Sequence, residues 1–190
     1  MVLVHWGRIL HDRIQRRSQA TKACPTMSPM VVLVPPPSMR FSFPCTGWKA
    51  LQKARSTCPE FSISTILSFF LDSRERDGKP SANFKAVVGD NKPIRLIQAG
   101  YVSKIQLVRV DSKVFFTAQC QPEMRTASDY KIRFAVESTL PPPDSGCPAS
   151  VSYFPYSECT GPAGKGPRAS CKHIAAVLYA LEEFSCLGLV

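Results

Sequence analysis

The sequence predicts an α+β protein: a small antiparallel sheet with a loop and a helix at its C-terminal end, preceded by a disordered basic region. Between residues 101 and 158, four segments alternate or nearly alternate apolar and polar side chains, as half-buried strands do. Two further segments repeat apolar residues at helical spacing. The first 58 residues hold nine basic side chains and one acidic one. We therefore divide the 190-residue chain into a disordered basic region, 1–58, and an α+β domain, 59–190.

The predicted domain begins with a short helix over residues 60–73. Ile63, Ile66, Leu67 and Phe70 keep helical spacing there and predict a helix that docks on the sheet. The polar stretch 74–93 contains two turn signals and is expected to be an extended connector.

The sheet is predicted from four strands. Residues 101–110 and 114–120 alternate on either side of a short polar turn, which is typical of a β-hairpin. Residues 130–136 alternate again, and residues 151–158 form a weaker strand interrupted by Pro155, which favours an edge position. The aromatic side chains of this block are interpreted as core and cross-strand pairs rather than as platforms for stacking nucleic-acid bases.

A helix is expected to begin near Cys171, with Ser170 as its N-cap. Apolar residues at 174, 177, 178 and 181 mark one buried stripe. The eleven positions between Cys159 and Cys171 are rich in Gly and Pro, so they are expected to form a loop that doubles back and brings its ends together. Cys159, Cys171 and His173 would then meet at one point. Two thiolates and an imidazole are ligands of structural Zn²⁺, so the sequence predicts a zinc site there.

These residues resemble the SWIM-type zinc finger, whose pattern is Cys-x-Cys, a variable loop, and Cys-x-His followed by a hydrophobic helix. The resemblance covers roughly residues 150–185. Cys159 matches the first ligand of the pattern, Cys171 the third and His173 the fourth, while Gly161 stands where the pattern has its second cysteine. The resemblance implies a structural zinc ion in a module that recognises DNA or a protein partner.

Since a closed structural zinc site takes four protein ligands, the departure at Gly161 leaves one position to be filled. Cys147, Cys186 and Cys120 are the candidates, with Cys147 favoured because it lies on a predicted turn and Cys186 disfavoured because it follows the helix. The alternative is a degenerate finger that binds zinc weakly or not at all.

Other chemistry is less well supported by these residues. Catalytic cysteine–histidine pairs are brought together by the fold rather than by neighbouring positions in the sequence, which disfavours a nucleophile pair here. The Gly-Lys-Gly segment at 164–166 lacks the spacing of a phosphate-binding loop. Lys165, Arg168 and Lys172 are instead predicted to form a basic rim that contacts a nucleic-acid backbone. We expect no catalytic residues and no small-molecule substrate.

Composition limits the function further. The net charge of +10 comes mostly from residues 1–58, and a flexible basic arm is attracted to nucleic acid or to anionic surfaces. Eight cysteines without a secretory signal favour metal binding and free thiols over disulfides. We therefore expect the protein to be located inside the cell, in the nucleus or the cytoplasm. No membrane-spanning segment is expected.

A second interpretation concerns the whole chain. A helix ending at residues 69–72, a strand start at 100–102, the hairpin and the finger together resemble the N-terminal part of SWIM-containing proteins in which a YqaJ-like viral-recombinase exonuclease follows. The catalytic residues of such a nuclease would lie beyond residue 190. On this alternative, the chain is a truncated accessory half of a nuclease-type protein, with no catalysis of its own.

Overall fold

The computed structural model describes residues 42–72, 91–123, 128–139, 149–162 and 169–187. The chain divides into two compact units, Met1–Ser42 and Phe43–Val190, and apart from Ser42 the described residues all belong to the second. The predicted disordered region lies outside the described residues as far as residue 41, and most of the finger loop, residues 163–168, also lies outside them.

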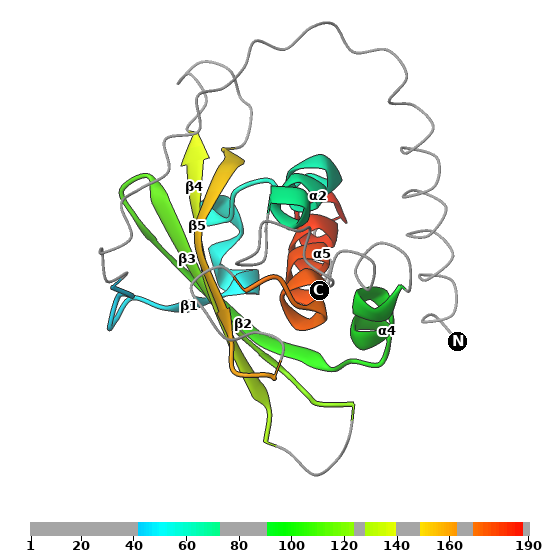
Figure 1. Ribbon diagram of the computed structural model, residues 1–190. Helices are drawn as coiled ribbons and strands as arrows, with labels where there is room; N and C mark the ends of the chain where they lie inside the picture. The colour runs from blue at the N-terminus through cyan, green and yellow to red at the C-terminus, as the bar shows by residue number, and fades with distance from the viewer. Residues whose placement is uncertain (1–41, 73–90, 124–127, 140–148, 163–168, 188–190) are drawn as a thin grey trace, which may run out of the picture. The chain divides into compact units, whose positions relative to one another are not determined.

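The second unit has an α+β fold, as predicted from the sequence. Its sheet is an antiparallel meander in which neighbouring strands are consecutive in the chain: β1 (Lys49–Ala50), β2 (Val102–Val110), β3 (Lys113–Cys120), β4 (Tyr130–Thr139) and β5 (Ser150–Cys159). The described helices are the 3₁₀-helix η1 (Leu51–Thr57), α2 (Ile63–Asp72), α4 (Lys92–Gln98) and α5 (Lys172–Leu187). Figure 1 shows α2, α4 and α5 on one side of the sheet.

The four strands expected between residues 101 and 158 are confirmed as β2 to β5, and the two expected helices as α2 and α5. Val110 of β2 pairs with Lys113 of β3, so the turn between the two strands consists of Asp111 and Ser112 alone. Asp111 adopts a left-handed conformation there, with φ of 53°. Aspartate tolerates this region better than most residues, so the polar turn recognised in the sequence closes the hairpin.

The core lies between the sheet and the helices. Phe116 of β3 stacks on Phe134 of β4 with ring centroids 4.9 Å apart, and both side chains are fully buried. Phe69 of α2 packs on Phe154 of β5 at 4.6 Å, which docks this helix against the sheet as predicted. Phe116 and Phe134 therefore form a cross-strand pair in the core, as the sequence indicated.

Helix α5 is buried more completely than its sequence suggested. The pattern predicted one apolar stripe, yet every side chain from 173 to 182 is buried. Helix α5 contacts the sheet and also the two helices α2 and α4. A helix covered on several sides needs small or apolar residues all round, and Ala175, Ala176 and Ala180 provide them.

The unit also begins earlier than the boundary near residue 59 that we expected. Lys49 and Ala50 pair with β2, and Leu51 and Ala54 of η1 belong to the core. A two-residue strand and a 3₁₀-helix are too short to leave a periodic pattern in the sequence. Helix α4 was missed for the same reason: its first two residues, Lys92 and Pro93, were assigned to the extended connector, and nothing was predicted for the rest of this seven-residue helix.

The segment before β1 covers the outer face of the sheet, opposite the helices. Phe43 makes edge-to-face contacts with Phe115 and Tyr156, each with ring centroids 5.4 Å apart. Gly47 lies against Val108 with φ of 87°, and a Cβ atom there would come within 3.2 Å of the valine side chain. Only glycine combines this conformation with this close approach.

Across the part of the chain that the structure describes, no helix combines the length and the apolar character needed to cross a membrane.

Candidate metal centre

Cys159 is the last residue of β5 and points into the core. It pairs with Ile132 of β4, whose side chain faces the helices, and only 3% of Cys159 is exposed. Beyond it, Thr160 N–H donates to the carbonyl of Lys131 at 3.0 Å, and the Lys131 N–H donates to Thr160 Oγ1 at 2.9 Å. These two bonds continue the strand pairing past Cys159 and fix the position of its thiol.

The far end of the loop returns to the same strand. The Ala169 N–H donates to the carbonyl of Ser157 at 3.0 Å, and Ser157 Oγ donates to the carbonyl of Ala169 at 2.8 Å. Ser157 is fully buried, so these are bonds shielded from water. The expected return of the loop is therefore confirmed by its described ends, although residues 163–168 lie outside the described part.

Cys171 occupies the cap position of α5. The helix begins at Lys172, so the N-cap is Cys171 and the expectation of Ser170 was wrong by one residue. The thiol of Cys171 accepts a hydrogen bond from the Ile174 N–H, as the side-chain oxygen of a serine or aspartate N-cap does. His173 follows in the first turn, and its side chain is buried.

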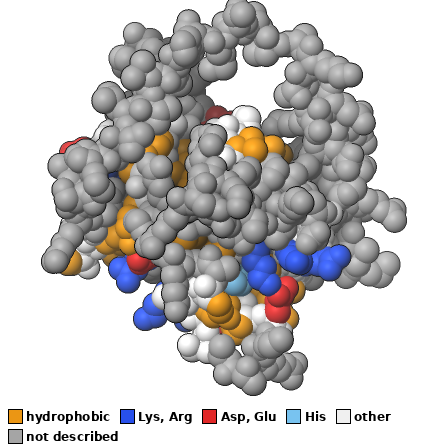
Figure 2. Space-filling view, viewed as in Figure 1, with side chains coloured by type: hydrophobic (Ala, Val, Ile, Leu, Met, Phe, Trp, Pro, Cys, Tyr) orange, Lys and Arg blue, Asp and Glu red, His pale blue; other side chains and the backbone are white. Residues whose placement is uncertain are grey.

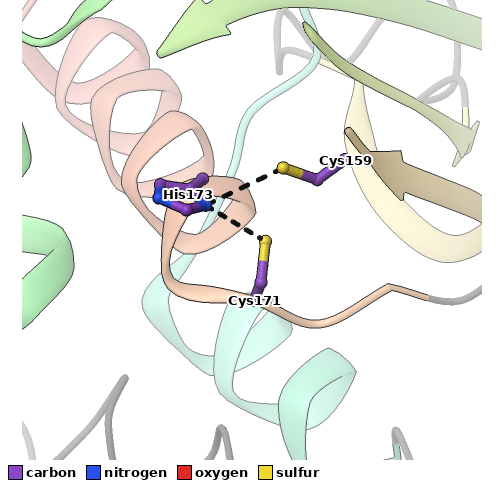
Figure 3. Close-up of side chains that lie close together, drawn as sticks. All are labelled: Cys159, Cys171 and His173. Carbon is purple, nitrogen blue, oxygen red and sulfur yellow. Dashed lines mark hydrogen bonds between the residues drawn. The ribbon is translucent and has the colours of Figure 1, made fainter. Parts of the chain in front are cut away.

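The three predicted ligands converge (Figure 3). Nδ1 of His173 lies 3.8 Å from Sγ of Cys159 and 3.8 Å from Sγ of Cys171, and all three ligand atoms lie within 4.8 Å of one another. Ordinary zinc–sulfur and zinc–nitrogen bonds in a tetrahedral site place a sulfur and a nitrogen about 3.6 Å apart. The described geometry therefore fits a zinc ion with little movement of these side chains.

The imidazole is held by a ring contact that the sequence did not reveal. Tyr130, the first residue of β4, lies against His173 with ring centroids 4.8 Å apart. Tyr130 and Ile132 alternate onto the inner face of β4, so the period of the strand could have identified this neighbour. The contact restrains the ring with Nδ1 toward the two thiols.

Hydrogen bonds favour the thiolate form of Cys171. The pKa of Cys171 is lowered, first because it accepts a hydrogen bond from Cys159 and further through bonds from His173 and the Ile174 N–H, although burial acts in the opposite direction. The same hydrogen bond, together with burial, raises the pKa of Cys159 well above its ordinary range. Binding a divalent ion therefore requires the loss of a proton from Cys159.

Position 161 faces the same group of atoms. The Gly161 N–H donates to Sγ of Cys159 at 3.4 Å. A Cβ atom at this position would lie 3.3 Å from Nδ1 of His173 and 3.4 Å from that sulfur. The residue that departs from the SWIM pattern is thus adjacent to the site.

The three cysteines considered as a fourth ligand differ in their position relative to the site. Cys147 lies outside the described residues. Cys186 is exposed, bonds to Glu182, and stands thirteen residues along α5 from His173, about 20 Å at the rise of an α-helix. Cys120, at the end of β3, is buried, and its thiol donates a hydrogen bond to the carbonyl of Gln121. Its sulfur is not part of the group formed by Cys159, Cys171 and His173, whose donor atoms all lie within 4.8 Å of one another.

The predicted basic rim is described only at Lys172, since Lys165 and Arg168 lie outside the described residues. Lys172 forms an ion pair with Glu123, and its hydrogen bond is the main reason that the pKa of Glu123 is lowered. Figure 2 shows basic and acidic side chains together beside the pale-blue histidine. Within the described part, the surface next to the site is therefore of mixed charge.

Fold and site together define an α+β domain with a candidate metal centre of two thiols and one imidazole at the junction of β5 and α5. No family model, curated protein or solved structure matches this chain.

Proposed function

We propose that this protein binds one zinc ion through Cys159, Cys171 and His173, and that the metal has a structural role. The observation that carries the proposal is the convergence of the three donor atoms within 4.8 Å, from the end of one strand and the start of one helix. A metal there links β5 to α5 across the loop and offsets the entropy of closing it.

Metal content of the purified chain tests this proposal. After expression with added zinc, we expect close to one equivalent in the wild type and less than about a tenth in Cys171→Ser or His173→Ala, because two protein ligands hold zinc poorly. Cys186→Ser is the matched control, since it removes a cysteine from the same helix outside the cluster, and it should retain the wild-type content. Wild-type protein with less than a tenth of an equivalent would refute the proposal.

We further propose that the metal-stabilised corner is a recognition module for DNA or a protein partner. Support comes from the basic residues in and beside the loop, Lys165, Arg168 and Lys172, and from the net charge of +10. The ion pair between Lys172 and Glu123 moderates this support, because it neutralises one of these charges.

A gel-shift titration over a range of salt concentrations separates the two kinds of partner. Phosphate contacts release counterions, so binding to DNA should weaken steeply as salt rises, and Lys165→Ala with Arg168→Ala should reduce the slope by about one to two. Glu123→Ala, which frees Lys172, should strengthen binding. The absence of any shift at low salt would exclude DNA and leave a protein partner.

A further inference from the structure

The three donors of the metal centre are enclosed by protein. Cys159, Cys171 and His173 are only 3%, 1% and 5% exposed, and Gly161 beside them is buried as well. The Gly161 N–H donates to Sγ of Cys159 at 3.4 Å, and even a Cβ atom at this residue would lie 3.3 Å from Nδ1 of His173. The glycine backbone therefore closes this side of the centre to a further ligand.

The donor set is soft and consists of three atoms. In the part of the chain that the structure describes, no fourth cysteine, histidine or carboxylate belongs to the group. Nδ1 of His173 lies 3.8 Å from each of the two sulfurs. An ion in one plane with its three donors, at ordinary bond lengths to sulfur and nitrogen, places these atoms about 3.8 Å apart. The arrangement therefore suits an ion that needs only three ligands.

Each sulfur also accepts a hydrogen bond from a backbone N–H. The Gly161 N–H donates to Cys159, and the Ile174 N–H, in the first turn of α5, donates to Cys171. Two thiolates and a neutral imidazole carry two negative charges, so a monovalent ion leaves one of them uncompensated. Backbone donors and a helix N-terminus stabilise negative charge on sulfur. The surroundings can therefore hold a singly charged ion.

Cu(I) combines these properties, because it is a soft monovalent ion that prefers thiolates and is satisfied by two or three ligands. A structural zinc ion, in contrast, takes four protein ligands. We propose that the metal centre is a closed three-coordinate site for Cu(I), and that Cu(I) displaces zinc from it. The proposal rests on the same three ligands as the proposed zinc site. In the exchange, three bonds to zinc break and three bonds to copper form between the same donors, without transfer of an electron or a proton.

An anaerobic titration of the zinc-loaded full chain tests the displacement. Cu(I) is supplied as its bicinchoninate complex, whose loss of colour measures the copper bound, and a zinc indicator dye measures the zinc released. We expect the first equivalent of bound Cu(I) to release one equivalent of zinc. The control is the double variant Cys45→Ser and Cys186→Ser, which removes two exposed thiols outside the centre and should release zinc as the wild type does. Zinc that stays bound while Cu(I) is in excess would overturn the proposal.

Two ligand variants distinguish the two metals. His173→Ala should hold less than about a tenth of an equivalent of zinc, because two protein ligands hold zinc poorly, yet it should still take Cu(I) from bicinchoninate through its two thiolates. Cys171→Ser should lose both metals. Cys171→Ser that takes up Cu(I) as the wild type does would overturn the proposal, since other cysteines would then hold the ion.

X-ray absorption at the copper edge of the same sample counts the ligands. We expect two sulfurs and one nitrogen, with the edge feature of three-coordinate Cu(I). A third sulfur or a fourth donor would overturn the closed three-coordinate site, and the variant that removes the extra sulfur, Cys120→Ser or Cys147→Ser, would identify the ligand.

The outcomes separate this inference from the proposal on which it rests. Wild-type protein that binds zinc and keeps it against Cu(I) would overturn the inference and leave the zinc site in place. Protein that takes up Cu(I) with two sulfurs and one nitrogen but never holds zinc would support the inference and refute the structural zinc ion. Protein that binds neither metal would refute both.

Discussion

Ser157 ties the returning end of the loop to β5, two residues before the first candidate ligand. Its Oγ and its carbonyl make two hydrogen bonds to Ala169, and its side chain is fully buried. Ala169 in turn precedes Cys171 by two residues. These bonds therefore hold the residues just before α5 against the end of β5, close to both thiols.

Replacing Ser157 with alanine should lower the free energy of unfolding by about 1–2 kcal/mol, because the carbonyl of Ala169 would be left buried without its side-chain donor. Ser152→Ala is the control: Ser152 lies on the same strand and donates to the carbonyl of Glu137 at 3.0 Å, but it is exposed. We expect that substitution to change stability by less than about 0.5 kcal/mol. Urea denaturation measures both, and equal losses would show that burial of the bond is unimportant.

The candidate ligand residues could be found from the sequence. That position 161 faces these ligands could not. Cys159, Cys171 and His173 stand out because cysteine and histidine flank a Gly- and Pro-rich loop before an apolar helix. Whether residue 161 faces the site or solvent depends on the backbone after β5, which the bonds between Thr160 and Lys131 fix. Those bonds join two strands and leave no local pattern.

At the scale of elements, the segment before β1 shows what periodicity misses. Phe43 crosses the outer face of the sheet and contacts Phe115 of β3 and Tyr156 of β5. Arg133 of β4 lies over the same ring at 5.6 Å. One aromatic side chain therefore joins three strands from a stretch that the sequence placed in a disordered region.

Phe43→Ala should consequently destabilise the domain by about 1–2 kcal/mol, since a partly buried aromatic ring and two edge-to-face contacts would be lost. Leu71→Ala is the matched control, because Leu71 is a large apolar residue that is 54% exposed. It should cost less than about 0.5 kcal/mol. If thermal or urea unfolding gives Phe43→Ala the same small effect as Leu71→Ala, the segment does not belong to the folded unit.

Across the domain as a whole, the described cysteines fall into three environments, and none is in a disulfide. Cys45 and Cys186 are exposed. Burial raises the pKa of Cys58 and of Cys120, each to about 12. The remaining two form the candidate metal centre.

These environments predict an order of alkylation by iodoacetamide near pH 8. The thiolate is the reactive form, so Cys45 and Cys186 should react first and Cys58 and Cys120 slowly, because a raised pKa keeps them protonated. In zinc-loaded protein, Cys159 and Cys171 should be protected until a chelator removes the metal. Peptide mass spectrometry measures each site. Rapid labelling of Cys58, or no effect of the chelator on Cys159 and Cys171, would contradict this account.

The sequence by itself determined the α+β class, the order of strands β2 to β5, the helices α2 and α5, and the three residues of the candidate metal centre. Each of these follows from a local signal, either a repeat of two or 3.6 residues or a pair of ligand residue types at the ends of a turn-rich loop. The tertiary structure alone decided that residues 173–182 of α5 are all buried, that Phe43 and η1 belong to the domain, and that Gly161 and Ser157 lie beside the site. These features arise from contacts between segments distant in the chain, and such contacts do not depend on any periodicity within one segment.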